Sequence, residues 1–431
     1  MSVPARAWAV TAAGTAVNLC LGILYGWSVW KAALVPKDKT LYGQPMTGTN
    51  AGWTYLSNSE GNLAYAVCGV TFALFMIPGG RLQDRYGAKL GATLGGLFLA
   101  LGCVVAGVLK SFEGLVLGFG VLGGIGMGLG YAAATPAAVK WFHSSRRGLI
   151  VGLVVAGYGA AAVYISPLAD YLIETYGLTG SFVGLGVLFA VVVVVAGQLL
   201  TPPPIGYAAP APGAAAQAGA PATGAPPARD FGATQMLATW QFYLLVFLFV
   251  GSAQSGLLVI ANAKSFLNDA AEKGSYFARN GWVLVTFIGA VNALGRVGTG
   301  QYSDRVGRLN AYALNGIVSA VCLLATPWVI GEKNVAFLFV VIGVMAWQYG
   351  GTLAVLPAVT ADYYGPKNLG LNYGLVFTGW GIAFFVPQLA SAIKDATDRW
   401  DGAFYLSGGL LVAAVLVSRI IRKPVSVAPA A

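Results

Sequence analysis

Charged side chains are scarce in this sequence, where Asp, Glu, Lys and Arg together make up 9% of the 431 residues. A soluble globular domain has roughly 25%. Because so few charged side chains cannot keep the surface of a chain of this length in water, a water-soluble fold is excluded.

Cysteine and histidine are also rare, with four cysteines and one histidine in the chain. All the cysteines fall inside apolar runs, and none has C-x-x-C or C-x-x-H spacing: Cys20, Cys68, Cys103 and Cys322. The sequence therefore predicts no disulfide, no metal site and no cofactor. It also has no paired nucleophile and base and no aspartate-rich diphosphate motif, so an intramembrane enzyme is disfavoured.

Apolar residues, in contrast, are abundant: 57% of the chain is hydrophobic, and its mean hydropathy is +0.72. They form runs of about 20 residues, the length that a helix needs to cross a bilayer core of roughly 30 Å. We therefore predict an all-α membrane protein. Charged and turn-rich breaks divide the chain into twelve spans, near residues 7–33, 61–82, 88–109, 112–139, 148–173, 178–200, 240–265, 277–302, 309–331, 335–361, 369–393 and 401–422.

The formal net charge of +10 fits a membrane topology better than a nucleic-acid partner, which would require a basic face on a soluble domain. With both termini in the cytoplasm, the inner segments hold 14 basic residues, whereas the outer segments and span ends hold ten. This difference follows the positive-inside rule. The sequence therefore predicts a multi-pass protein of the plasma (inner) membrane, surrounded by lipid, with both termini cytoplasmic.

A central segment separates six spans from six. Residues 201–230 carry eight of the 20 prolines and almost no charge, which is typical of a disordered linker. The predicted organisation is an N-terminal six-helix bundle over residues 1–200, a Pro- and Ala-rich cytoplasmic linker over residues 201–235, and a C-terminal six-helix bundle over residues 236–431.

The two halves repeat each other in sequence. The motif G-x-x-x-D-R-x-G begins at Gly80 and again at Gly300, and the segment GLIVGLVVAGYG from Gly148 aligns without gaps with GLNYGLVFTGWG from Gly370. This repeat predicts two pseudo-symmetric bundles packed about an axis along the membrane normal. In rocker-switch transporters built this way, the substrate site lies near the bilayer midplane, between the repeats.

The doubled G-x-x-x-D-R-x-G motif resembles the signature of the major facilitator superfamily, and the twelve spans and the central linker agree with it. The segment WFHSSRRGL from Trp141, the AGYG sequence of span five and the pair Asn292-x-x-x-Arg296 look like those of the monocarboxylate transporters and their relatives, the oxalate:formate exchangers. The resemblance implies the major facilitator fold and transport of small carboxylates. We expect the protein to function as a monomer.

Arg296 is the one basic residue deep inside a predicted span. It lies eight residues before Asp304, roughly 12 Å from the cytoplasmic surface at 1.5 Å per residue, and therefore near the midplane. A buried arginine is costly there unless it binds an anion, and its planar fork suits a carboxylate. The alternative is a structural ion pair, but no Asp or Glu lies near the centre of any span. The resemblance implies that Arg296 binds the substrate.

Three further polar side chains are predicted near Arg296. Asn292 lies one helical turn away and can offer its amide to a substrate or form an ordinary interhelical hydrogen bond. Tyr131 and Tyr349 lie at corresponding midplane positions of spans four and ten, where each can donate a hydroxyl to a carboxylate or only pack as an aromatic ring. Mammalian monocarboxylate transporters carry an aspartate at the position of Asn292, assigned to the coupled proton, and an asparagine cannot take that proton.

Trp380 stands where the resemblance places a lysine in an oxalate:formate exchanger. A dianion would then meet one central positive charge instead of two, so we expect a monoanion as the substrate. Tyr25 and Lys31 share the outer half of span one. We interpret Tyr25 as part of the site, and Lys31 as a proton-coupling or gating residue that collects anions, the alternative for Lys31 being a side chain that snorkels to the outer interface.

The repeated motif predicts a gate. Residues 80–87 and 300–307 are expected to form short loops, in which Asp84 and Asp304 pair with a helix terminus or an arginine and lock one access state. Arg85 and Arg305 belong to the same two loops.

These observations favour a secondary transporter over a channel or a receptor-like sensor, because a twofold repeat with one buried charge fits alternating access. The leading hypothesis is proton symport of small monocarboxylates such as L-lactate or pyruvate. The alternative is carboxylate exchange of the oxalate:formate antiporter type. The identity of the preferred acid and of the proton-carrying group stays open at this point.

Overall fold

The computed structural model describes residues 4–143, 147–204, 206–207, 230–365 and 368–424. Helices dominate this part of the chain, and within it the only β-type pairing is an isolated bridge between Pro45 and Thr54. The all-α prediction is therefore confirmed. The predicted linker, residues 201–235, lies largely outside the described residues, so its boundaries stay a prediction.

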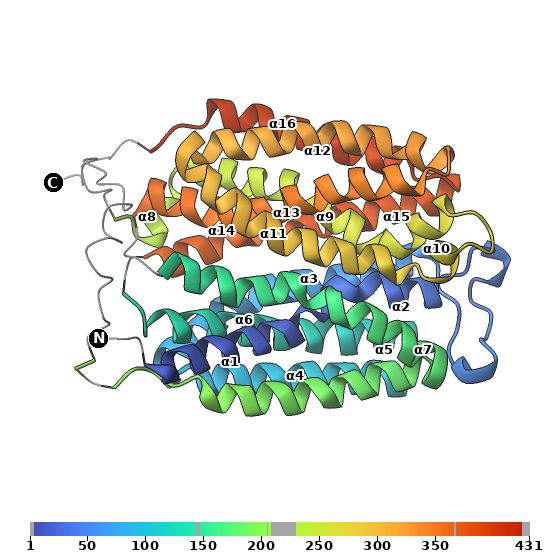
Figure 1. Ribbon diagram of the computed structural model, residues 1–431, viewed down its shortest axis with the longest axis horizontal. Coiled ribbons are helices and arrows are strands. Elements are labelled where there is room, and N and C mark those ends of the chain that lie inside the picture. The colour runs from blue at the N-terminus through green and yellow to red at the C-terminus, as the bar shows by residue number, and fades with distance from the viewer. Residues whose placement is uncertain (1–3, 144–146, 205, 208–229, 366–367, 425–431) are drawn as a thin grey trace.

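The N-terminal helices build the lower part of the molecule in Figure 1. Span one is made of α1 and α2, joined by a single 3-10 segment, η1. Span four begins with the short helix α5, passes through a π-helical segment, η4, and ends with α6. The elements are α1 (Ala5–Leu21), η1 (Gly22–Gly26), α2 (Trp27–Leu34), α3 (Asn58–Tyr86), α4 (Ala88–Leu109), α5 (Phe112–Leu115), η4 (Val116–Gly123), α6 (Gly124–Val139) and α7 (Arg147–Leu199).

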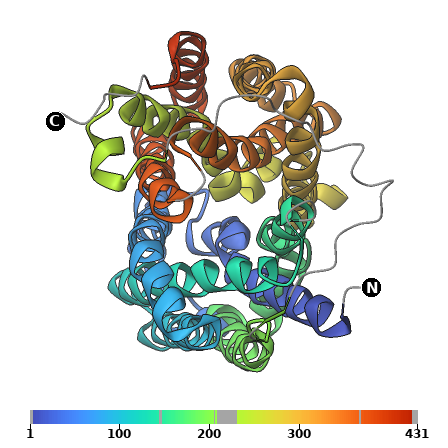
Figure 2. The ribbon, with the colours of Figure 1, turned by 90° about the vertical axis from the view of Figure 1, so that its left-hand side faces the viewer.

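The C-terminal helices build the upper part in Figure 1, and the end-on view in Figure 2 shows the two groups of helices facing each other. They are α8 (Ala233–Leu237), α9 (Trp240–Ala270), α10 (Tyr276–Arg279), α11 (Trp282–Val306), α12 (Arg308–Gly331), α13 (Val335–Tyr364), α14 (Leu369–Ala383), α15 (Phe385–Thr397) and α16 (Asp401–Ile420).

Eleven helices in the described residues are long and apolar enough to cross a membrane. One of them, Leu149–Leu199, has 51 residues and would extend about 77 Å at 1.5 Å per residue, more than twice a bilayer core. Its backbone leaves the helical conformation at Gly177, where φ is 72°, and this kink divides it into two limbs. When the limbs are counted separately, the candidate spans in the described residues number twelve, which is consistent with the twelve predicted spans.

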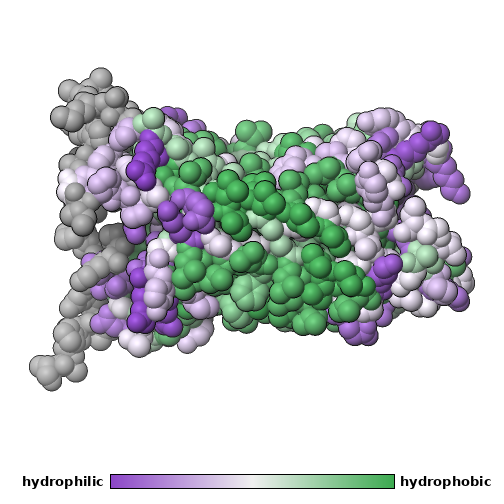
Figure 3. All heavy atoms as spheres, turned by 90° about the horizontal axis from the view of Figure 1, so that it is seen from below, coloured by the Kyte–Doolittle hydropathy of each residue, from purple (hydrophilic) through white to green (hydrophobic). Residues whose placement is uncertain are grey.

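The surface agrees with a membrane environment. Figure 3 shows a broad band of apolar side chains across the middle of one face of the molecule and hydrophilic side chains at both ends of that face. The helix α1 begins and α16 ends at the left of Figure 1, which we call the terminal end. The loop of residues 35–57 and α10 lie at the right, which we call the loop end. The chain is therefore an integral, multi-pass membrane protein.

Two sequence predictions are wrong in detail. Residues 80–87 and 300–307 are the last turns of α3 and α11, and not loops, because only the final glycine of each motif leaves the helix. Gly87 and Gly307 adopt φ of 86° and 92°, which glycine reaches without the steric cost of a Cβ atom. Span eight starts at Trp282 and not near residue 277, because the preceding residues form the separate short helix α10, capped by Ser275.

Candidate functional site between the two groups of helices

Arg296 on α11 lies between the two groups of helices with 7% of its surface exposed. Its guanidinium donates hydrogen bonds to three acceptors: Nη1 to the backbone oxygen of Val155 on α7 (3.2 Å), Nη2 to the hydroxyl of Tyr25 in η1 (3.2 Å), and Nε to Oδ1 of Asn292 on its own helix (3.4 Å). One arginine thus joins the C-terminal helices to two segments of the N-terminal helices.

A chain of hydrogen bonds extends from this arginine across the site. The hydroxyl groups of Tyr25 and Tyr349 lie 2.8 Å apart, and the indole nitrogen of Trp380 donates to the Tyr349 hydroxyl at 2.8 Å. The structure therefore brings Arg296, Asn292, Tyr25, Tyr349 and Trp380 together, as the sequence predicts for a binding site. Trp380 occupies its position as a hydrogen-bond donor that holds Tyr349.

Several donors in this cluster are left for a ligand. A guanidinium has five N–H groups, and the three bonds of Arg296 use one N–H on each nitrogen. One N–H on each terminal nitrogen therefore lies outside these three bonds and can donate to a carboxylate or to the nearby Tyr131 hydroxyl. The Asn292 amide nitrogen is buried without a hydrogen-bond partner. Tyr25 and Tyr349 share one hydrogen bond, so one of their two hydroxyl protons is also free to donate.

Aromatic rings wall the cluster on the side of the N-terminal helices. Tyr158 packs edge-on against Tyr25, with ring centroids 5.0 Å apart, and against Tyr131 at 5.3 Å. Phe72 contacts both Tyr131 (5.5 Å) and Trp380 (5.1 Å). Tyr131 also lies beside the guanidinium, with its hydroxyl within hydrogen-bonding reach of Arg296. The sequence analysis missed Tyr158, although the AGYG sequence that contains it was recognised.

Arg296 has no carboxylate partner in the part of the chain that the structure describes. The six ion pairs there join other residues and lie toward the two ends of the molecule. The structural ion pair considered as an alternative for Arg296 is therefore not formed. Gly159 keeps α7 close to the guanidinium, since a Cβ atom at this position would lie 3.2 Å from Arg296 Nε.

Lys31 on α2 lies closer to the loop end and is 1% exposed. Its Nζ donates to Oδ1 of Asn262 on α9 (2.5 Å) and to Oγ of Ser391 on α15 (3.3 Å), and it lies 5.7 Å from the centroid of the Trp400 ring. The snorkelling alternative does not describe this side chain, because a lysine that snorkels keeps its ammonium in water. Lys31 instead joins the two groups of helices.

The charged residues of the repeated motif lie apart from this cluster, at the terminal end. Asp84, Arg85, Asp304 and Arg305 are exposed. Asp304 pairs with Arg308 at the start of the next helix (2.6 Å), and Arg308 also lies 3.8 Å from Asp362 on α13. These pairs stay within the C-terminal helices, so a gating role for the motif stays a prediction.

Polar contacts between the two groups of helices gather toward the loop end. Lys37 pairs with Asp269 (3.0 Å), Lys39 pairs with Asp398 (2.7 Å), and Lys264 pairs with Asp170. Asn62 on α3 donates to the backbone oxygen of Pro387 on α15 (2.9 Å). These contacts lie between the level of Arg296 and the loop end. The structure is thus closed at the loop end.

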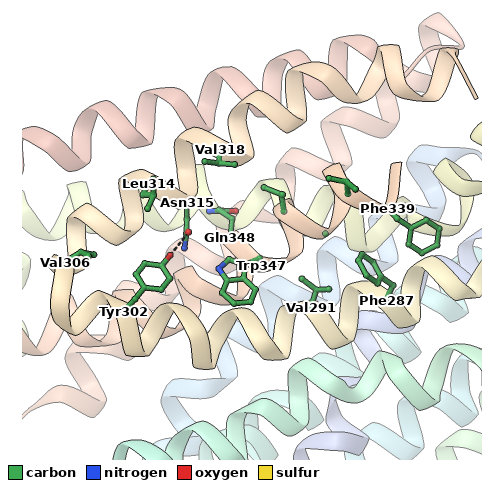
Figure 4. A pocket seen from close by; sticks show the side chains of 13 residues that line it. Phe287, Val291, Tyr302, Val306, Leu314, Asn315, Val318, Phe339, Trp347 and Gln348 are labelled. Atoms are coloured by element: carbon green, nitrogen blue, oxygen red, sulfur yellow. Dashed lines mark hydrogen bonds between the residues drawn. The ribbon is translucent and has the colours of Figure 1, made fainter. Parts of the chain in front are cut away.

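A groove of about 760 Å³ lies elsewhere, between α11, α12 and α13 (Figure 4). Its lining is mostly apolar, and the Tyr302 hydroxyl in it donates to Oδ1 of Asn315 at 2.5 Å. Val306, Leu314 and Val340 on its rim are exposed at the surface of the spanning helices. None of the predicted binding residues lines it, so we place the candidate site at Arg296 and not in this groove.

Comparison with known proteins shows similarity to membrane transporters. The sequence profile of the Major Facilitator Superfamily matches residues 12–329 and 270–431. An uncharacterized MFS-type transporter of Escherichia coli, YhjX, is 27% identical over 374 residues, which cover 86% of this chain and 85% of that protein. The oxalate:formate antiporter of Oxalobacter formigenes is 26% identical over 377 residues (84% of each chain). Monocarboxylate transporter 12 of Xenopus laevis is 24% identical over 371 residues (80% of this chain and 78% of that protein).

The helical fold, the internal repeat and these relatives define a multi-pass membrane transporter. The chain belongs to the major facilitator superfamily. Members of this superfamily are transporters and not enzymes.

Proposed function

We propose that the protein transports small monocarboxylates, such as L-lactate or pyruvate, by proton symport with alternating access. The observation that carries this proposal is the buried Arg296, which has no carboxylate partner among the described residues and lies beside the unpartnered amide nitrogen of Asn292. A carboxylate between them would accept from the remaining N–H groups and neutralise the buried charge. Two relatives that are named for carboxylate transport support the same substrate class.

We further propose that the protein lies in the plasma (inner) membrane as a functional monomer with both termini in the cytoplasm. The terminal end then faces inward, with Arg85, Lys89, Arg305 and Arg308 near the cytoplasmic surface, as the positive-inside rule favours. The loop end faces outward. The closed loop end then corresponds to a carrier that is shut to the outside.

Exchange of carboxylates is the second candidate function. One feature of the site favours it: Asn292 carries no titratable group, so the amide next to Arg296 cannot bind and release a proton. A carrier that returns only with a second carboxylate bound would never move the bare Arg296 through a closing site. The relative named as an oxalate:formate antiporter is consistent with this alternative.

Counterflow and uptake in proteoliposomes would test the two candidates. With a panel of labelled acids, we expect acid outside to drive accumulation of lactate or pyruvate, and oxalate and malonate to compete far less than monocarboxylates. The physical reason for the second expectation is that Arg296 supplies one positive charge and Trp380 supplies none. Uptake that ignores the pH gradient but requires a carboxylate inside would favour exchange, and oxalate as the strongest competitor would contradict a monoanion site.

The substitution Lys31→Ala is expected to weaken the response of uptake to a pH gradient without destroying substrate binding. Lys31 contacts Asn262 and Ser391 and does not take part in the hydrogen bonds of Arg296, so its loss removes a buried cation from the closing surface and leaves the binding donors in place. Initial uptake rates with and without the gradient, together with half-saturation in counterflow, would measure the two effects. Lys273→Ala, which changes an exposed lysine in the loop between α9 and α10, is the matched control. If uptake by Lys31→Ala responded to the pH gradient as strongly as uptake by the unmodified protein, Lys31 would have only a packing role.

A further inference from the structure

Asp395 on α15 caps the first turn of α3 across the boundary between the two groups of helices. Its Oδ1 accepts from the backbone N–H of Asn58 (3.2 Å) and from Asn58 Nδ2 (3.1 Å). Its Oδ2 accepts from the backbone N–H of Ser59 (2.8 Å) and from Ser59 Oγ (2.6 Å). We call Asp395, Asn58 and Ser59 the loop-end latch. Four donors therefore converge on one carboxylate, at a helix end whose partial positive charge also favours an anion.

No ion pair in the described chain includes Asp395, so hydrogen bonds and the helix end hold its charge, together with the longer-range attraction of the Lys31 ammonium. Lys39 donates to the backbone oxygen of Asp395 (2.5 Å) and forms its ion pair with Asp398 instead. Lys394 donates to the backbone oxygen of Asp398 (2.6 Å). Lys31 donates to Oγ of Ser391, which lies one helical turn before Asp395 on α15.

Two further titratable groups lie around the latch: Glu60, which is hydrogen-bonded to another residue, and Tyr42, which is neutral. The carboxylate of Glu60 on α3 accepts hydrogen bonds from the backbone N–H and the hydroxyl of Ser57 (2.8 and 2.9 Å). Burial, together with the nearby carboxylates of Asp395 and Asp398, raises the pKa of Tyr42 to about 12, so this phenol stays neutral. Of these groups, the Asp395 carboxylate is therefore the charged group that accepts the hydrogen bonds of the latch.

The latch lies beside a pocket at the loop end. This pocket of about 280 Å³ lies between the two groups of helices, and its lining includes Asn58 of the latch together with Lys39, Tyr42 and Asp398 beside it. Asp395 itself is half-buried. An external proton can therefore reach the carboxylate without passing through the interior of the protein.

We propose that Asp395 is a proton-binding site through which external acid opens the loop end. The charged carboxylate accepts all four hydrogen bonds at neutral pH. When a proton from the external solution binds one carboxylate oxygen, that oxygen carries an O–H group that faces the N–H and O–H donors of Asn58 and Ser59. The carboxyl group also loses its negative charge, so its attraction to the helix end is lost. The latch is thus present above the pKa of Asp395 and lost as the pH falls through it. The proton returns to the same solution when the latch forms again, so it is not carried across.

This inference rests on the proposed function only in assuming that the loop end opens during transport and faces outward. It gives the carrier a sensitivity to external pH that is separate from the transport of a proton. An exchanger with this latch would also run faster in acid outside, without any proton moving with the substrate. The two effects can therefore be measured apart.

A distance measurement at the loop end tests the proposal without any substrate. Spin labels would be attached at Glu113→Cys, between α4 and η4, and at Glu332→Cys, after α12, in a Cys322→Ser background. Both glutamates are exposed at the loop end, and the other native cysteines are buried. We expect double electron–electron resonance to show one main distance at neutral pH and a longer second population in acid.

Asp395→Asn is expected to show the longer population at neutral pH, with the ratio of open to closed carriers raised about tenfold and no longer dependent on pH, because a charged acceptor has been replaced by a neutral one of the same shape. Asp401→Asn is the matched control, since Asp401 pairs with Arg399 within the C-terminal helices (2.5 Å) and is expected to behave as the unmodified protein. The proposal is overturned if Asp395→Asn keeps the pH dependence, or if the unmodified protein shows none.

A second variant tests the hydrogen bonds and leaves the carboxylate in place. The double change Asn58→Ala and Ser59→Ala removes two of the four donors, so the longer population should rise at neutral pH and should still increase in acid. Distances identical to those of the unmodified protein at both pH values would contradict the latch. Because neither measurement requires a carboxylate, failure of monocarboxylate transport would leave this test unaffected.

Discussion

Arg296→Ala and Arg296→Lys are both expected to abolish carboxylate uptake, with rates lowered about a hundredfold or more, the scale for removing one partner of a buried charged hydrogen-bonded pair. The alanine variant loses the charge. The lysine variant keeps a positive charge but loses the planar guanidinium. The guanidinium donates to Val155, Tyr25 and Asn292 in three directions, and it still has two N–H groups outside these bonds, which one ammonium cannot replace. Uptake and counterflow in proteoliposomes would measure the loss.

The loss should be one of binding and not of folding. Both variants are expected to elute as monodisperse protein with unfolding temperatures close to that of the unmodified chain, because Arg296 carries no ion pair in the described structure. Arg308→Lys, at the terminal end, is the matched control: its ion pairs lie outside the site, and it should transport normally. Near-normal uptake by Arg296→Ala would remove this residue from the site.

The fold could be predicted from the sequence because its signals are local. A bilayer core fixes the length of a spanning helix, so the apolar runs indicate the helices directly, and α4 was predicted at residues 88–109, where it is observed. Errors arose where a helix end depends on one residue. The G-x-x-x-D-R-x-G motif contains charges and glycines that suggest a loop, but its earlier residues continue the helix, and only Gly87 and Gly307 end it.

The centre of the candidate site could also be predicted, since a lone arginine at the midplane is costly enough to indicate a ligand. Its neighbours could be predicted less completely. In the sequence, Trp380 indicated only that the site lacks a second positive charge. The structure shows that it also donates a hydrogen bond to Tyr349. Tyr158 was missed because nothing in a helical sequence tells whether a tyrosine faces the partner bundle.

Lys31 was predicted as a residue of this end, but the contacts of the loop end could not be predicted, because they join residues far apart in the chain. Lys31 bonds Asn262 and Ser391, and Asp395 bonds Asn58 and Ser59. Each partner alone is an ordinary polar residue at the end of a span. Only the packing of the N-terminal helices against the C-terminal helices places them together, and a hydropathy pattern contains no information on that packing.

Gly350→Ala is expected to cause the second large loss, in stability as well as in transport. Gly350 lies on α13 next to Tyr349, and a Cβ atom there would overlap the backbone oxygen of Asn292 on α11. Because a backbone atom inside a helix cannot move away cheaply, α11 and α13 must separate, and overpacking of this kind costs about 1–3 kcal/mol. The same shift displaces Asn292 and Tyr349, so uptake should fall about tenfold or more, in line with the loss expected when a binding geometry is displaced by about 1 Å.

Gly374→Ala provides the matched comparison, because this glycine lies on α14 with no atom within 4 Å of the added Cβ. Alanine is also the better helix former, so this variant should be as stable as the unmodified chain or slightly more so, and should transport normally. Thermal unfolding and half-saturation in counterflow would be measured on both variants. If Gly350→Ala matched Gly374→Ala in both measurements, the close approach of α11 and α13 would not be what positions Asn292 beside Arg296.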